Sequence, residues 1–263
     1  MSTDLAPLIR ALEVVRPYLG DIVLVGGWVP IVYQQCTSIY PTRTIRTADI
    51  DLACPAPLAV KGESIDDLLR GAGFECNMFG STEVPFCRYS DNHDCEIEFL
   101  TPLKGDGTAT VTELQQGLTA ENLRYLDVLL RHTAPIKIYE KLVVNVPWIS
   151  AFLFQKGLSF PDRRSGLKRD KDLYYIFKVV EIVDREYLIT ELRQVIEAHP
   201  YKWGRTFAQN MRKVFDDEYS PGVISVVDQL QHIPGEQSDH SDTLAMRVFV
   251  TIEGFMADLK MLA

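Results

Sequence analysis

The sequence changes its pattern once, close to Pro147, and this change constrains the fold more than any other feature. Before Pro147, short apolar runs of strand character alternate with segments of helical spacing. After it, apolar residues recur at helical spacing only, which predicts helices at about 148–158, 168–184, 186–198, 204–215, 221–231 and 241–260. We therefore expect an α/β (α+β) domain with a mixed sheet over residues 1–147 and a C-terminal helical domain over residues 148–263.

The first half begins with a helix and a strand that lead into two glycines. Apolar residues at helical spacing predict a helix over Leu5–Val15, and Ile22–Val25 has the β-branched character of a buried strand. Two glycines come next, followed by a helical segment, Trp28–Gln35, and a polar loop. Ala48–Cys54 alternates acidic and apolar positions and is expected to be a strand. Further elements are expected as a helix near Asp66–Arg70, strands at Phe74–Met78, Pro85–Tyr89 and Cys95–Leu100, a helix at Glu121–Arg131, and a hairpin of Ile136–Tyr139 with Leu142–Val146.

Composition and charge exclude several classes of protein. The 263 residues are 46% hydrophobic and 24% charged, as in ordinary globular proteins. No apolar run reaches the roughly 18 residues of a membrane span. The net charge is −9, yet residues 150–213 hold 13 Lys and Arg against 8 Asp and Glu. An acidic body with one basic segment argues against bulk nucleic-acid coating and permits a local phosphate site, although a solvated helix face would give the same count.

Cysteine and histidine spacing gives little support to metal or disulfide chemistry. The five cysteines include no CxxC pair, and the histidines show no HxxxH or HExxH spacing, so zinc is not expected. No P-loop, GxSxG or GxGxxG motif occurs. The opening MSTDLAPLIR lacks the charged-then-apolar layout of a secretory signal. We therefore expect a reduced, cytoplasmic protein.

The segment Val23–Leu52 carries the most chemical information. Glycines directly after a strand let the backbone approach a ligand, and free N–H groups at the start of the next helix favour phosphate. On the following strand, Asp49 and Asp51 are two residues apart and face the same side. Paired carboxylates repel each other unless a cation lies between them, and such oxygen ligands suit Mg²⁺ (or Mn²⁺) bound with substrate phosphates. Glu96 and Glu98, alternating on a later strand, offer a third carboxylate for phosphoryl transfer.

These motifs resemble a known signature. Gly26-Gly27-Trp28, followed by Arg46–Leu52 (RTADIDL), is similar to the GG or GS turn and the (S/T)xDxD strand of the DNA polymerase β-type nucleotidyltransferase superfamily. Glu96–Pro102 (EIEFLTP) resembles the strand that carries that family's third acidic residue. The resemblance implies that Asp49 and Asp51 bind the metals. It leaves Glu96 and Glu98 as competing third ligands, of which we favour Glu98.

The downstream sequence resembles one branch of this superfamily. Val144–Pro147, a helix with Gln155 and Lys156, and Lys168–Leu173 (KRDKDL) follow the layout of bacterial uncharacterised nucleotidyltransferases related to the abortive-infection (AbiEii-like) toxins. Gln155 stands where the branch usually has His. The roles that the resemblance implies are nucleotide contact by Gly26, Gly27 and Thr47, triphosphate contact by Lys156, and an active-site position for Asp172 with Lys168 and Lys171 nearby.

Two basic segments have alternative interpretations. On a helix, Lys168 shares a face with Lys171 and Asp172, and cations stacked in this way suit the departing pyrophosphate. A salt-bridged surface helix would give the same pattern, and Lys156 in FLFQKGL could simply extend its ammonium from an apolar helix. The segment around Trp203 mixes aromatic and basic residues, and we favour core packing with a solvated face over contact with nucleic acid.

The sequence thus predicts a Mg²⁺-dependent nucleotidyltransferase. It would move a nucleoside monophosphate from a nucleoside triphosphate (NTP) to an acceptor hydroxyl on a tRNA, a protein or a small molecule, and release pyrophosphate. The resemblance to the toxin branch implies an antitoxin as a partner. Two alternatives stay open: a catalytically silent module that binds a nucleotide or a partner protein, and a metal-dependent hydrolase with the same carboxylates.

Overall fold

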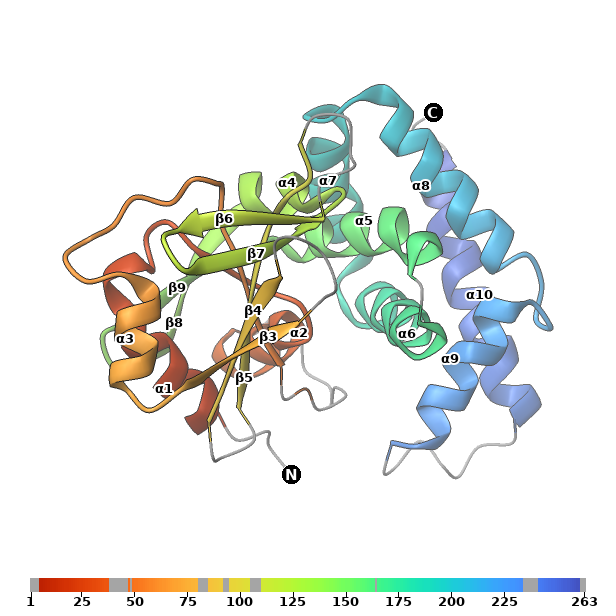
Figure 1. Ribbon diagram of the computed structural model, residues 1–263. Helices are drawn as coiled ribbons and strands as arrows, with labels where there is room; N and C mark the ends of the chain where they lie inside the picture. Colours follow the sequence, from red (N-terminus) through yellow and green to blue (C-terminus); the bar gives the residue numbers. More distant parts are fainter. Residues whose placement is uncertain are drawn as a thin grey trace. The chain divides into compact units, whose positions relative to one another are not determined.

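The computed structural model describes residues 5–37, 47, 49–79, 85–91, 95–104, 110–163, 165–233 and 241–260. Most of the polar loop expected before the DxD strand, the turn after Lys104, and the positions of His93 and Arg164 lie outside the described residues. The chain divides into two compact units, Met1–Trp148 and Ile149–Ala263. Figure 1 shows a sheet with helices in the first unit and helices in the second. The mixed sheet and the helical second unit confirm the predicted fold class.

The N-terminal unit is built on one mixed sheet. Its strands lie in the order β3-β4-β5-β2-β1-β9-β8, and β7 pairs with both β5 and β6. The pairs β2–β5, β1–β9 and β5–β7 are parallel, and the other pairs are antiparallel. The strands are β1 (Val23–Val25), β2 (Asp49–Ala53), β3 (Glu75–Phe79), β4 (Phe86–Ser90), β5 (Glu96–Pro102), β6 (Val111–Gln115), β7 (Leu118–Leu123), β8 (Thr133–Tyr139) and β9 (Leu142–Pro147). The helices of this unit are α1 (Ala6–Val14), α2 (Trp28–Cys36), α3 (Ile65–Gly71) and α4 (Leu126–Arg131), with a 3₁₀ turn at Arg16–Tyr18.

The helix predicted over Glu121–Arg131 is wrong in its first part. Residues up to Leu123 form β7, which makes an antiparallel hairpin with β6, and only Leu126–Arg131 is helical. The turn between the two strands contains Gly117 at φ +82°. β7 also pairs in parallel with β5, with Leu100 beside Glu121. Sheet pairing with a distant strand therefore overrides the helical character of the local sequence.

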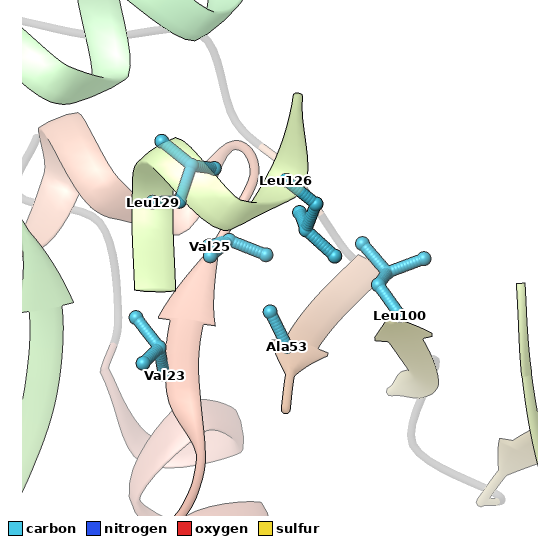
Figure 2. Packing of buried hydrophobic residues seen from close by; sticks show 6 residues of the cluster. All are labelled: Val23, Val25, Ala53, Leu100, Leu126 and Leu129. Atoms are coloured by element: carbon cyan, nitrogen blue, oxygen red, sulfur yellow. The ribbon is translucent and has the colours of Figure 1, made fainter. Parts of the chain in front are cut away.

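Helix α4 covers one end of the central strands on one face. Figure 2 shows the buried apolar cluster, which combines residues of three strands with two leucines of α4: Val23, Val25, Ala53, Leu100, Leu126 and Leu129. Residues that pair directly across strands have side chains on the same face of a sheet. Because Val25 pairs with Asp51 and Leu100 pairs with Ala53, the acidic residues of β2 and β5 belong to this same face, beyond the cluster.

The C-terminal unit is built around one buried helix. Every residue of α5 (Ile149–Ser159) is buried, and α5 packs against α6, α7 and α8. Gly157 permits a close approach, because a Cβ atom there would lie 2.4 Å from the Phe207 ring. The other helices are α6 (Gly166–Ile182), α7 (Arg185–Glu197), α8 (Tyr201–Val214), α9 (Pro221–Gln231) and α10 (Ser241–Lys260), with a 3₁₀ turn at Phe160–Asp162. None of the helices in the described ranges is long and apolar enough to cross a membrane.

Candidate active site

Strand β2 presents its two aspartates on one face and its apolar residues on the other. Ile50 and Leu52 are fully buried, Asp51 is half-buried and Asp49 is exposed. This alternation follows directly from the two-residue period of a strand. The carboxylates of Asp49 and Asp51 therefore project from the same side of the sheet, as the sequence predicts.

Gly26 lies against the Asp51 carboxylate. Strand β1 pairs with β2 so that Val25 is opposite Asp51, and the chain then turns at Gly26 with φ +70°. A Cβ atom at Gly26 would lie 1.8 Å from the Asp51 Oδ2 atom. Only glycine fits here, both because of its positive φ and because no space remains for a side chain. The glycine turn and the DxD strand, distant in sequence, thus form one site.

Gly27 and Thr47 make a second close approach. A Cβ atom at Gly27 would lie 2.9 Å from the Thr47 Cβ atom. The Thr47 hydroxyl oxygen lies 3.5 Å from the Asp49 carbonyl oxygen. Helix α2 begins directly after Gly27, so its first N–H groups lie next to this turn. Three of the residues expected to contact the nucleotide, Gly26, Gly27 and Thr47, therefore surround the start of one helix.

Strand β5 adds two glutamates to the same face. It pairs in parallel with β2, with Glu96 beside Asp49 and Glu98 beside Asp51. Glu98 is buried, whereas the Glu96 side chain is 37% exposed. The structure thus brings both candidate third carboxylates to the aspartate pair, and Glu98 is the one next to Asp51.

Arg88 of β4 binds both glutamates. It is directly opposite Glu98 in the antiparallel β4–β5 pair and forms an ion pair with that carboxylate. Its Nη1 atom also lies 3.3 Å from the Glu96 Oε2 atom. Arg88 is not among the residues that the sequence predicts for the site. The available signal was its place in a short strand directly before the acidic strand, but the register that sets Arg88 opposite Glu98 cannot be read from local sequence.

The acidic face fits a divalent cation that a substrate helps to hold. Within the described ranges, no three His, Cys, Asp or Glu side chains form a ready-made metal site. Mg²⁺ commonly binds through one or two carboxylates together with substrate phosphates, and not through a complete protein cage. Asp49 and Asp51, side by side next to a glycine turn, supply such a pair.

In the C-terminal unit, Lys156 and Asp172 form a buried ion pair. The Lys156 Nζ atom lies 2.5 Å from Asp172 Oδ1, and Arg163 Nε lies 2.8 Å from Asp172 Oδ2. Both Lys156 and Asp172 are more than nine-tenths buried. The ammonium also lies 5.4 Å from the Phe152 ring centre. The structure therefore brings the predicted Lys156 and Asp172 together, with Arg163 as a second cation on the same carboxylate.

Lys168 and Lys171 lie at the start of α6, and the mixed aromatic and basic segment around Trp203 lies on α8. Lys168 is exposed and Lys171 is half-buried, within the same helix as Asp172. On α8, Trp203 stacks on His199 with ring centres 5.3 Å apart. Tyr201 and Lys202 are exposed. The stacking of Trp203 agrees with the packing interpretation of this segment.

A family model described as nucleotidyltransferase matches residues 3–199, about three quarters of the chain and both the DxD strand and the Lys156–Asp172 pair. The chain belongs to this nucleotidyltransferase family. Membership in this family makes the protein an enzyme of nucleotidyl transfer.

Several solved structures resemble the fold at low sequence identity. A proposed nucleotidyltransferase from H. pylori has a TM-score of 0.43 and 11% identity, with 97% of each chain covered. JHP933 from Helicobacter pylori has the same TM-score and identity, with 98% of this chain and 95% of that chain covered. An antigenic nucleotidyltransferase-like protein from Paracoccidioides brasiliensis has a TM-score of 0.36 and 16% identity, with 79% of this chain and 94% of that chain covered. No curated protein matches the sequence.

Proposed function

We propose that the protein transfers a nucleoside monophosphate from an NTP to an acceptor hydroxyl, with Mg²⁺ or Mn²⁺, and releases pyrophosphate. One observation carries the proposal: the glycine turn at Gly26 lies against the carboxylate of Asp51, and Asp49 projects from the same face. A phosphate held at the turn would therefore lie beside two carboxylates, and the three anions together call for a divalent cation.

Each residue of this site has a physical task. The backbone N–H groups at Gly27 and the first turn of α2 face a developing negative charge on the phosphates, because the first N–H groups of a helix have no partner within it. Asp49 and Asp51 would hold the cation. When bound, that cation supplies positive charge to the α-phosphate and lowers the pKa of a coordinated hydroxyl.

The proton of the attacking hydroxyl goes to a carboxylate oxygen. Asp51 and Glu98 are neighbours in the sheet and both are candidates. Glu98 forms an ion pair with the Arg88 guanidinium, whereas the Asp51 carboxylate lies against Gly26. We propose that Asp51 or Glu98 accepts this proton, at an oxygen atom that does not hold the cation.

The experiment is calorimetric titration of each of the four NTPs, with and without Mg²⁺. Binding of at least one NTP that depends on Mg²⁺ and is lost in Asp49→Asn and Asp51→Asn is the expected result. Glu253→Gln is a matched control, because Glu253 is an exposed carboxylate on α10. Binding that survives both aspartate substitutions would overturn the proposal.

The acceptor can be identified by transfer of label. We propose a hydroxyl of a tRNA, a protein or a small molecule, and an NTP labelled at the α-phosphate distinguishes these by the fraction that becomes labelled. Label in only one fraction, absent with Asp51→Asn, names the acceptor class. If the protein binds an NTP and loses that binding in the aspartate variants, yet labels no fraction, the proposal of nucleotidyl transfer is contradicted.

The finer relationship to bacterial toxins rests on the Lys156 and Lys168–Leu173 motifs. We propose that the protein is a bacterial, cytoplasmic member of the AbiEii-like branch, in which an antitoxin would restrain it. All five cysteines are free thiols, as a reducing compartment requires. Growth arrest on induced expression in a bacterial host, absent with Asp49→Asn, would support the toxin assignment, and unimpaired growth with soluble wild-type protein would contradict it.

A further inference from the structure

Arg88 lies in a row of polar side chains that crosses four strands. In register across the sheet, Asn77 of β3 is opposite Arg88 of β4, Arg88 is opposite Glu98 of β5, and Glu98 is beside Asp51 of β2. Directly paired residues share a face, so the guanidinium faces the same side as the carboxylates. The positively charged Arg88 guanidinium therefore lies at the edge of the proposed metal site.

The Arg88 guanidinium contacts both glutamates of β5. Its Nη2 atom pairs with Glu98 Oε1, and its Nη1 atom lies 3.3 Å from Glu96 Oε2. The guanidinium carbon also lies 4.7 Å from the centre of the Phe79 ring. Ring and carboxylates together restrict the side chain, because a guanidinium binds oxygen atoms in its plane and stacks on aromatic rings with its face.

The charge of Arg88 acts unevenly on the four carboxylates. Both of its ion pairs are with β5, and its side chain is 26% exposed. Glu98 is buried, so its carboxylate needs a positive partner more than the exposed Asp49 does. One partner of Glu98 in the protein without nucleotide is thus a guanidinium, at a carboxylate that a two-metal site would use to hold a metal ion.

We propose that Arg88 is a positioning residue that competes with divalent cations for Glu98. With Arg88 in place, the nucleotide-free protein holds one cation through Asp49 and Asp51, and a second cation can be held through Glu98 only when Arg88 releases it. This inference rests on the proposed function for the assignment of the aspartate pair as the cation site.

The test is uptake of Mn²⁺ by nucleotide-free protein, followed by the electron paramagnetic resonance signal of free Mn²⁺. Arg88→Gln removes the charge and keeps a polar side chain. We expect this variant to bind one more Mn²⁺ than wild type, or to bind Mn²⁺ about tenfold more tightly, which corresponds to about 1.4 kcal/mol. Arg16→Gln is the matched control, because Arg16 also pairs with a carboxylate, that of Glu13, on the surface. Unchanged or weaker uptake by Arg88→Gln would overturn the proposal.

A double variant tests whether Glu98 is the carboxylate for which Arg88 competes with the cation. Arg88→Gln combined with Glu98→Gln should return Mn²⁺ uptake to the wild-type level or below, and a gain that persists would place the new cation elsewhere. If Arg88→Gln does not fold, Arg88→Lys keeps one charge but loses the fork that reaches both glutamates. The rise in Tm with Mn²⁺ should then be larger for Arg88→Lys than for wild type, and an equal rise would contradict the proposal.

The outcome is separable from that of the proposed function. Wild-type protein that binds NTP with Mg²⁺, together with an Arg88→Gln variant whose Mn²⁺ uptake is unchanged, overturns only the role of Arg88. If wild-type protein binds no NTP but the Arg88→Gln variant gains a cation, the proposal of nucleotide transfer is overturned. The proposal that Arg88 competes with divalent cations for Glu98 then still holds.

Discussion

Gly26 and Asp51 approach each other so closely that a single methyl group on Gly26 would overlap the aspartate carboxylate. The Cβ position of Gly26 is 1.8 Å from Asp51 Oδ2, and its φ is +70°. The backbone at the end of β1 therefore determines where the carboxylate of β2 can lie. A turn that appears in the sequence only as two glycines serves here to set the geometry of the acidic face.

Gly26→Ala should destabilise the protein more than Gly62→Ala and should also impair the site. Gly62 is the matched control, because it has φ +79° and nothing within 4 Å of its Cβ position. Both substitutions incur the strain of a left-handed residue, about 1–2 kcal/mol. Only Gly26→Ala adds the clash with Asp51. Urea unfolding together with NTP titration measures both effects, and equal results for the two variants would contradict a role for this contact.

The alternation of β2 was predictable from the sequence, and the assembly of the acidic face was predictable only in part. Asp49 and Asp51 face one way because a strand has a period of two residues, and this needs no tertiary information. The neighbourhood of Glu98 and Asp51 depends on the parallel pairing of β2 with β5, which are 47 residues apart in the chain at these positions. The resemblance to known nucleotidyltransferases suggested that neighbourhood, whereas local pattern could not.

Arg88 and the β6–β7 hairpin show where local reasoning fails. A basic residue in a short strand is usually a solvated one, and only the register of β4 on β5 reveals that it faces Glu98. Glu121 has helical propensity, yet β7 pairs with β5 and becomes a strand. In the first case the deciding information is the register of two consecutive strands, and in the second it is the pairing of β7 with a strand that is not its neighbour in the chain, so propensity yields to sheet pairing.

Asp172→Asn should destabilise the protein more than Lys156→Met. Removing the Asp172 carboxylate breaks its ion pairs with the buried Lys156 ammonium and with Arg163 at once. Lys156→Met leaves Asp172 paired with Arg163. Breaking a buried ion pair typically costs about 3–5 kcal/mol, which we expect for Asp172→Asn, with a smaller loss for Lys156→Met. Urea unfolding of the single and double variants tests this order, and a reversed order would show that Arg163 does not support Asp172.

Gly157→Ala should destabilise the C-terminal unit although alanine favours helices. A Cβ atom at Gly157 would lie 2.4 Å from the Phe207 ring, so α5 and α8 would have to separate or the ring to shift. Overpacking of this kind costs about 1–3 kcal/mol. Gly71→Ala on α3 is the control, since nothing lies within 4 Å of its Cβ position, and it should be neutral or stabilising. If thermal unfolding shows the same Tm change for both, the packing of α5 on α8 is looser than the distance indicates.

Cys54 should make the protein less stable in alkaline solution. Burial, with a smaller effect from the negative charge of Asp21, raises the pKa of the Cys54 thiol from 9.0 to about 12. Because the pKa is higher in the folded state than in the unfolded state, the folded state retains the proton more strongly. The resulting stabilisation is complete below pH 9 and is lost as pH rises from 9 towards 12.

Urea unfolding midpoints measured from pH 7 to pH 11 test this expectation. Cys54→Ala removes the titrating group, so its midpoint should fall less steeply above pH 9 than that of wild type. Cys36→Ala is the control, because Cys36 is only half-buried and burial raises the pKa of its thiol less. A wild-type slope that Cys54→Ala leaves unchanged would mean that water reaches this thiol in the folded protein, and that the end of β2 next to the DxD pair is more open than its burial indicates.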